Sequence, residues 1–290
     1  MSYENSRTQF AEMALRRRLV VEPGVRRALW GSERWEISAH PGMPGRIADG
    51  ALAGRTLADA FPRFRLLFKT IEAHDPLSVQ VHPNEVSCRA TGGDPKSEMW
   101  CALADCAVYA GLRPGTTPDE LADAVRSGTA GELMVRHALK AGDAISIPGG
   151  MVHSIDGGAL VYEVQQSSDT TFRLYDWGRV GADGRPRELH VEKALMAIDY
   201  SLPPPVPGRS VETPFFSFRQ ERLSGELRVG GEGRFAAIRS ASGGFSLDGE
   251  PFADGSSVLL PPSVHGTLRA DGAWLLLTEW TDSAGPGADI

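Results

Sequence analysis

The sequence predicts a mainly β protein made of two β-barrel units with a few short helices. The chain of 290 residues contains 33 glycines and 20 prolines, a content that suits turn-rich β structure better than a helical bundle. Most segments are short, apolar or alternating, and end at turn residues. Residues 142–148 and 255–261 resemble each other, and a histidine follows each of them. This weak repeat predicts two copies of one barrel unit.

Short strands are predicted wherever apolar or alternating residues run between turn residues. The clearest cover residues 66–71, 77–81, 144–147, 160–165, 235–239, 257–260 and 274–278.

Three helices are predicted in addition to the strands. Thr117 followed by Pro118 and two acids is a helix start, because threonine caps the free N–H groups and proline fits the first helical position. That helix should end near Gly128. Apolar residues at helical spacing predict two more helices, over 6–18 and about 190–199.

A proline-rich stretch divides the chain. Residues 202–208 cannot continue a helix, because proline lacks the N–H donor and clashes with the preceding turn. We therefore predict a linker there. Residues 1–201 should form a metal-binding barrel with an N-terminal segment and a helical insert. Residues 209–282 should form a smaller, metal-free barrel, since His265 lacks companion ligands, and the tail from 282 should be frayed.

Composition excludes several functions. The net charge of −7 disfavours binding to nucleic acid or to acidic membranes. No stretch approaches the ~18 apolar residues of a membrane span, and no signal-peptide core is recognisable. The 3 cysteines lack CxxC spacing, which favours a reducing compartment over a disulfide framework. We expect a cytoplasmic monomer or weak homo-oligomer whose partner is a small molecule.

Two polar clusters are candidates for chemistry, and each has a simpler explanation. Ser78, Gln80 and His82 should point to one face of a strand, because side chains alternate; the alternative is the polar outer face of an exposed strand. Lys96 and Glu98 place a base beside an acid at a strand start; the alternative is a surface ion pair worth ~0–1 kcal/mol.

A third cluster is more specific. Gly142, Pro148, Gly150 and His153 match the pattern G-x5-P-x-G-x2-H, which resembles the second signature of the cupin, or jelly-roll, barrel. The alternative is a buried structural histidine. With His153, the residues Gln80, His82 and Glu98 make a candidate metal set, because imidazole and carboxylate suit Zn²⁺. Gln80 stands where the first cupin signature ordinarily has a histidine.

A fourth cluster runs from Glu163 to Arg179. Arg173 follows a predicted strand and could place a fixed positive charge at the barrel mouth. The alternative is a solvated loop in which Asp169 pairs with Arg173.

Taken together, these motifs resemble the type I phosphomannose isomerases in their short bacterial form. The residues that carry the resemblance are 29–31, 35–41, 67–69, 77–83, 96–100, 142–153 and 165–179. The segment 31–34 is shorter than the family usually shows. The resemblance implies interconversion of mannose 6-phosphate and fructose 6-phosphate through an enediol.

The resemblance also implies roles for individual residues. It implies one zinc ion per chain, with Gln80, His82, Glu98 and His153 as its ligands. It implies Arg173, Lys96 and Glu163 as catalytic residues, and Lys69, Ser78, Asp169, Arg179 and Trp30 as substrate contacts.

Several alternatives stay open at this point. Either Lys96 or Glu163 could be the base that carries the proton, and either Lys69 or Arg179 could hold the phosphate. The chain could instead be a cupin enzyme acting on another sugar or sugar phosphate, an iron-dependent cupin oxygenase, or a sugar-binding regulator without turnover.

Overall fold

The computed structural model describes residues 17–181 and 184–281. Most of the helix predicted over 6–18 lies outside these residues, and Arg17 and Arg18 are not helical. The tail predicted from residue 282 also lies outside them. Among the described residues, no helix is long and apolar enough to cross a membrane.

The chain divides into two compact units, here called unit A and unit B. Unit A comprises the described residues up to Gly24, Trp35–Leu67 and those from Arg209 onward; unit B comprises Val25–Arg34 and Phe68–Gly208. The division after Gly208 falls at the end of the proline-rich stretch. The domain bounds derived from the sequence stay predictions.

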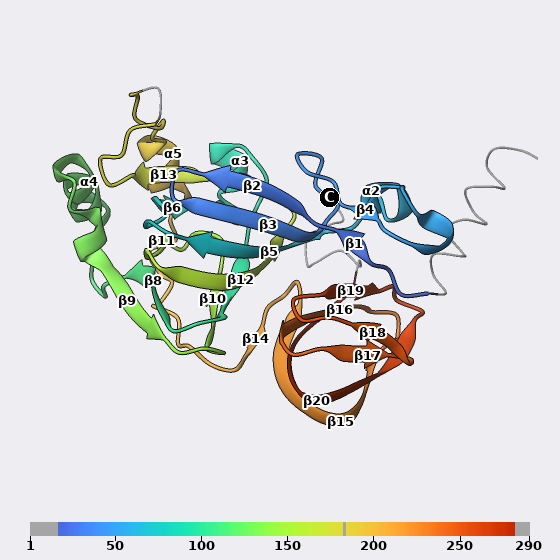
Figure 1. The fold of residues 1–290 in the computed structure, drawn as a ribbon. Coiled ribbons are helices and arrows are strands. Elements are labelled where there is room, and N and C mark those ends of the chain that lie inside the picture. Colours follow the sequence, from blue (N-terminus) through green and yellow to red (C-terminus); the bar gives the residue numbers. More distant parts are fainter. Residues whose placement is uncertain (1–16, 182–183, 282–290) are drawn as a thin grey trace, which may run out of the picture. The chain divides into compact units, whose positions relative to one another are not determined.

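β-strands dominate the chain, as the sequence predicts. A six-stranded sheet has the order β10-β7-β12-β5-β3-β2, and a five-stranded sheet has the order β13-β6-β11-β8-β9 (Figure 1). Their strands are β2 (Gly24–Ala28), β3 (Gly31–Ser38), β5 (Leu66–Ala73), β6 (Val79–Val81), β7 (Glu98–Ala102), β8 (Cys106–Leu112), β9 (Met134–Leu139), β10 (Ala144–Ile147), β11 (His153–Ile155), β12 (Ala159–Gln166) and β13 (Phe172–Tyr175).

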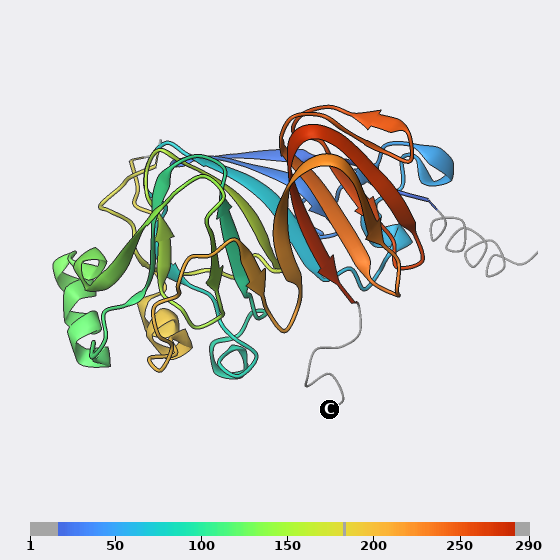
Figure 2. The same ribbon diagram turned by 90° about the horizontal axis from the view of Figure 1, so that it is seen from below.

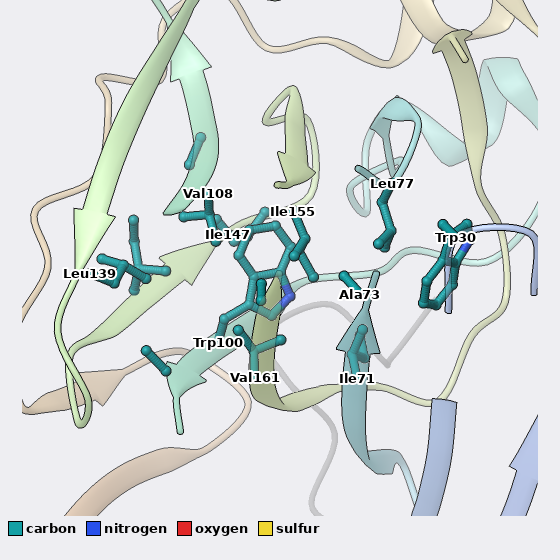
Figure 3. Packing of buried hydrophobic residues seen from close by; sticks show 14 of the residues in the cluster. Trp30, Ile71, Ala73, Leu77, Trp100, Val108, Leu139, Ile147, Ile155 and Val161 are labelled. Atoms are coloured by element: carbon teal, nitrogen blue, oxygen red, sulfur yellow. The ribbon is translucent and has the colours of Figure 1, made fainter. Parts of the chain in front are cut away.

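An apolar core lies between these two sheets in unit B. It receives Trp100 from β7 and Ile147 from β10 on one side, and Val108 from β8 and Ile155 from β11 on the other. Trp100 lies in the middle of this cluster (Figure 3). Trp30 belongs to the same cluster and is buried.

Helices cover the outer face of the five-stranded sheet. Val79 and Val81 of β6 pack in a second cluster with residues of α4 (Pro118–Ser127) and α5 (Val191–Ala197). Both helices confirm the sequence prediction. The remaining short helices are η1 (Gly50–Leu52), α2 (Leu57–Ala60), α3 (Cys88–Thr91) and η2 (Ala130–Leu133).

Local capping explains where α4 begins and ends. The Thr117 hydroxyl accepts a hydrogen bond from the Glu120 N–H, and the Glu120 carboxylate accepts one from the Thr117 N–H. Gly128 ends the helix in the left-handed conformation.

Unit A contains a seven-stranded sheet in which β14-β15-β20-β16-β19 are neighbours, while β17 pairs with β20 and β18 pairs with β17. The long strands β15 and β20 pair along most of their length and bend together (Figure 2). The strands are β14 (Ser210–Glu212), β15 (Ser217–Gly230), β16 (Phe235–Ser242), β17 (Phe245–Leu247), β18 (Glu250–Phe252), β19 (Ser257–Leu260) and β20 (His265–Trp280), beside a two-stranded sheet of β1 (Val21–Glu22) and β4 (Arg46–Ile47).

The two segments of the predicted repeat form equivalent strands. β10 and β19 each follow a glycine turn and end directly before a proline. His153 begins β11 and is buried, whereas His265 begins β20 and is exposed. The histidine after the second segment therefore lies at the surface.

Candidate active site

A row of three side chains crosses the five-stranded sheet. Gln80 of β6 lies directly opposite His153 of β11 on one side and Arg173 of β13 on the other. Directly opposed residues share one face of a sheet. Since Val79 and Val81 pack against the helices on the outer face, this row points to the inner face, toward the six-stranded sheet.

Two histidines and a glutamate meet on this inner face. His82 Nε2 and His153 Nε2 lie 3.1 Å apart. Glu98, at the start of β7, approaches from the six-stranded sheet, and its two carboxylate oxygens lie 3.4 Å from His82 Nε2 and 3.5 Å from His153 Nε2. All three residues are buried, and their ligand atoms lie within 4.8 Å of one another. The strand is therefore not an exposed one with a polar outer face.

The hydrogen bonds of the two histidines define their tautomers. His82 Nδ1 lies 2.8 Å from the Thr170 carbonyl oxygen, and His153 Nδ1 lies 2.8 Å from the Met151 carbonyl oxygen. Because a carbonyl only accepts, each Nδ1 carries the proton and each neutral ring has a lone pair on Nε2.

Burial keeps both rings neutral. Burial first, and then the Lys96 ammonium, lower the pKa of His82 to about 3. Burial also lowers the pKa of His153. Two lone pairs therefore face each other beside a carboxylate, an arrangement that a cation between them would stabilise. The donor set of two nitrogens and one oxygen suits a divalent metal such as zinc.

Lys96 places a positive charge beside these ligands. Its Nζ lies 2.7 Å from Glu98 Oε2 and 3.0 Å from His82 Nε2. Burial alone would raise the pKa of Glu98, but the Lys96 ammonium holds it well below its ordinary value. Lys96 and Glu98 are both buried, so the alternative of a surface ion pair is wrong.

A second buried ion pair lies beside the first. Lys69 Nζ of β5 lies 3.0 Å from Glu163 Oε1 of β12. Trp100 Nε1 donates a hydrogen bond of 2.9 Å to Glu163 Oε2, and the Trp100 ring packs edge-on against His153, with 5.5 Å between centroids. Trp100 thus connects the apolar core, the histidines and this carboxylate.

Glu163 has an unusual affinity for protons. Burial and the nearby Glu98 charge raise the pKa of Glu163, while Lys69 and Lys96 oppose that rise. Burial favours a neutral Lys69, but Glu163 and Glu33 raise the pKa of its ammonium. Glu163 therefore takes up a proton more readily than an exposed glutamate.

Arginines gather where β13 leads into the following loop. Asp176 accepts hydrogen bonds from Arg179 Nη2 at 2.5 Å and from Arg187 Nε at 2.7 Å and Nη2. Arg179 Nε and Nη1 are buried, as is Arg173 Nε, and none of these atoms has a hydrogen-bond partner in the described part of the chain. The cluster offers unpaired donors and an excess of positive charge.

Arg173 does not form the predicted alternative pair with Asp169. Its Nη1 donates to the Glu188 carbonyl oxygen at 3.1 Å, while Asp169 is exposed. Burial and the neighbouring Arg187 lower the pKa of Arg173. The guanidinium therefore belongs to the arginine cluster.

The remaining predicted substrate residues have different surroundings. Ser78 is buried and directly precedes β6, the strand that carries Gln80. Lys69 forms the ion pair with Glu163. Trp30 packs in the apolar core.

Sequence reasoning missed four polar residues in or beside the site. Gln165 lies opposite Glu98 and is buried, with a carbonyl oxygen that has no partner in the described residues. Gln165 and Asp176 lay within the motifs already singled out, whereas Glu33 and Arg187 had no local signal. Glu33 and Arg187 are revealed by contacts between segments that are far apart in the sequence.

Comparison with known proteins gives one consistent result, although no protein-family model matches the chain. The chain is 34% identical over 276 residues to a mannose-6-phosphate isomerase of Bacillus subtilis, covering 83% of this chain and 86% of that protein. It is 30% identical over 223 residues to a mannose-6-phosphate isomerase of Streptococcus mutans, covering 68% and 71%.

Solved structures agree on the fold. The crystal structure of the mannose 6-phosphate isomerase from Bacillus subtilis superposes with a TM-score of 0.81 at 24% identity, covering 90% of this chain and 99% of that one. A mannose 6-phosphate isomerase bound with zinc and yttrium superposes with a TM-score of 0.68 at 15% identity, covering 91% and 99%. These neighbours confirm the mainly β, cupin-type fold predicted from the sequence.

Proposed function

As a member of the mannose-6-phosphate isomerase family, the chain is an isomerase, and we propose that it interconverts mannose 6-phosphate and fructose 6-phosphate with one zinc ion. The observation that carries this proposal is the pair of His82 and His153 Nε2 lone pairs, 3.1 Å apart beside Glu98. The Lys96 ammonium offsets the repulsion at His82 and Glu98, and a metal ion that also faces His153 Nε2 would stabilise the whole set. A zinc-bound isomerase among the structural neighbours supports the choice of metal.

His82, Glu98 and His153 would hold the metal, and Gln80 would complete the set. Gln80 lies directly opposite His153 on the inner face, so its amide oxygen is available as a neutral ligand. When bound, the metal supplies positive charge to the substrate oxygen that becomes negative in the transition state. The Lys96 ammonium, which contacts Glu98 and His82, would add charge at the same place.

The reaction needs a group that carries a proton between two carbons. A base removes the proton from C2 of the aldose, and O1 gains a proton as the C1–C2 enediol forms. The carbon-bound proton then returns to C1 while the O2 hydroxyl loses its proton, which leaves the carbonyl at C2. We assign this base to Glu163 rather than Lys96. Glu163 is buried with a raised pKa, and a base is most effective when its pKa lies near the working pH. Lys96, in contrast, already contacts two of the proposed metal ligands, Glu98 and His82.

Arg173 would stabilise the enediolate charge. It lies directly opposite Gln80, with Gln80 between it and His153. A fixed guanidinium beside a developing negative charge is preorganised for the transition state.

The phosphate would bind at Arg179 rather than at Lys69. Lys69 is already paired with Glu163. Arg179 Nε and Nη1, in contrast, are buried with no hydrogen-bond partner among the described residues, while Asp176 orients Nη2. Arg179 and Arg187 together with Asp176 leave a net positive charge, which suits a phosphate that carries ≈ −1.5 to −2 at pH 7. Ser78 and Asp169 stay predicted substrate contacts, and Trp30 is left out because it packs in the core.

The test combines metal analysis with a coupled isomerase assay. The purified chain should contain close to one zinc, and mannose 6-phosphate should be converted, with unphosphorylated mannose as a control. Chelation should abolish turnover, and zinc should restore it. If the enzyme converts only a different sugar phosphate, the proposed substrate is wrong. If it contains iron in place of zinc, another cupin chemistry is favoured. Tight sugar binding without turnover would favour a regulator.

A further inference from the structure

The short segment between Trp30 and Trp35 brings a second carboxylate to the buried lysine. Gly31 begins β3 with φ +148, and a Cβ there would lie 2.0 Å from the Glu72 carbonyl oxygen of β5. Only glycine permits this approach. The chain therefore enters β3 tight against β5, and no loop intervenes before Glu33.

Glu33 lies beside Lys69 as a result. Its Oε2 is 4.0 Å from Lys69 Nζ, and the two side chains are only 15% and 8% exposed. Lys69 Nζ is also 3.0 Å from Glu163 Oε1. One buried ammonium is thus shared by two carboxylates, one of which is the proposed base.

We propose that Glu33 is a positioning residue that sets the proton affinity of Glu163 through Lys69. This inference rests on the proposed role of Glu163 as the base. Lys69 stabilises the ionised form of Glu163. Glu33 weakens that stabilisation, because its negative charge partly neutralises the positive charge of Lys69. Without Glu33, the full charge of Lys69 would act on Glu163, which would become a weaker base.

The other charged groups that face Glu163 do not involve Glu33. Lys96 and Glu98 act on Glu163 from β7 and the segment before it, and Trp100 donates its hydrogen bond from β7. Lys69 is the group facing Glu163 from β5. A substitution of Glu33 should therefore change the proton affinity of Glu163 without altering any proposed metal ligand.

The test compares pH profiles of the zinc-loaded enzyme. Glu33→Gln should move the acid limb of kcat/KM to lower pH by about 0.5 to 1 unit, because removing a nearby negative charge lowers the pKa of a carboxyl. The plateau kcat should fall, since a weaker base removes the proton more slowly. Glu33→Asp retains the charge and should keep the acid limb close to that of the parent.

Glu72→Gln is the matched control. Glu72 lies on the same strand as Lys69 but is exposed, so its removal changes the net charge equally without reaching the pair. A purely structural role for Glu33 would lower the melting temperature and leave the acid limb in place. An unshifted acid limb in a folded Glu33→Gln enzyme would overturn the inference.

A second measurement separates this inference from the proposed function. Carboxyl ¹³C NMR of glutamate-labelled protein reports the pKa of Glu163 directly, with the signal assigned by its loss in Glu163→Gln. A Glu163 pKa that falls in Glu33→Gln supports the inference even where Glu163→Gln keeps its activity and the base is another residue. A pKa that stays unchanged rejects the inference and leaves the assignment of the base to the kinetics.

Discussion

His82 Nε2 and His153 Nε2 lie 3.1 Å apart with no proton on either atom. Each ring is held in place from behind, because its Nδ1 donates to a backbone carbonyl. Such a second hydrogen bond is the usual way in which a protein orients an imidazole toward a metal. The two histidines therefore form a preorganised pair, and removing either one should destroy the site.

We expect His82→Ala and His153→Ala to lose bound zinc. Each change removes one nitrogen ligand, and catalytic zinc generally needs three protein ligands. Metal analysis of the purified variants measures the loss. His265→Ala is the matched control: its histidine is exposed in unit A, and it should retain zinc and keep kcat/KM within about threefold, under ~1 kcal/mol. Full zinc occupancy in both of the first two variants would show that the ligands are assigned wrongly.

Arg173→Ala should lower kcat strongly. Removing one preorganised donor to a developing oxyanion costs about 100-fold or more, while zinc content and KM should change little. Steady-state kinetics with mannose 6-phosphate distinguish the possibilities. A near-parental kcat would remove Arg173 from the mechanism. A rise in KM alone would move Arg173 to the phosphate site, beside the neighbouring Arg179.

Arg179→Met should raise KM for mannose 6-phosphate by about 10- to 100-fold, because hydrogen bonds to a charged group contribute about 1.5–3 kcal/mol each. Arg179→Lys keeps the charge and should lose less. Arg126→Met is a control for removing a positive charge, since Arg126 is exposed on α4. Inhibition by inorganic phosphate should weaken in parallel. An unchanged KM in Arg179→Met would place the phosphate elsewhere.

Asp176 should stabilise the fold in a pH-dependent way. Burial alone would raise its pKa, but hydrogen bonds from Arg187 and Arg179 lower it below the ordinary value. A lowered pKa means that the stabilisation is present above the unfolded-state pKa and is lost as the pH falls through the folded-state value. Urea unfolding at neutral pH should therefore show Asp176→Asn to be less stable than the parent.

The difference should shrink below about pH 4, the ordinary range for an aspartate. Asp143→Asn, a change at a carboxylate outside the arginine cluster, provides the comparison. A stability difference that persists unchanged at pH 3 would contradict the ion-pair account of Asp176.

Elements with strong local signals were predicted closely. The helix that begins after Thr117 and ends before Gly128 is α4, because capping and a left-handed glycine depend on neighbouring residues alone. The strands predicted over 144–147 and 257–260 are β10 and β19. Turn residues border each of them, so their ends are visible in the sequence.

Some of the predicted site residues also lie close together in the structure. His82, Glu98 and His153 were identified from motif spacing, and they meet in the structure. Glu33 and Arg187 were not found, because their roles depend on side chains that lie far along the chain. The sequence also could not distinguish Arg179 from Lys69 as the phosphate ligand, because it does not show that Lys69 Nζ is paired with Glu163.

By itself, the sequence determined which residue types occur at which spacing, and with them the β-rich fold, the helix ends and the candidate ligands. These properties follow from backbone geometry and from neighbours within a few residues. Only the tertiary structure decided which charges share a partner: Lys69 between Glu33 and Glu163, and Asp176 between Arg179 and Arg187. Such pairings depend on distances across sheets and loops, and the electrostatic effect of a charge on a pKa depends on that distance and on burial.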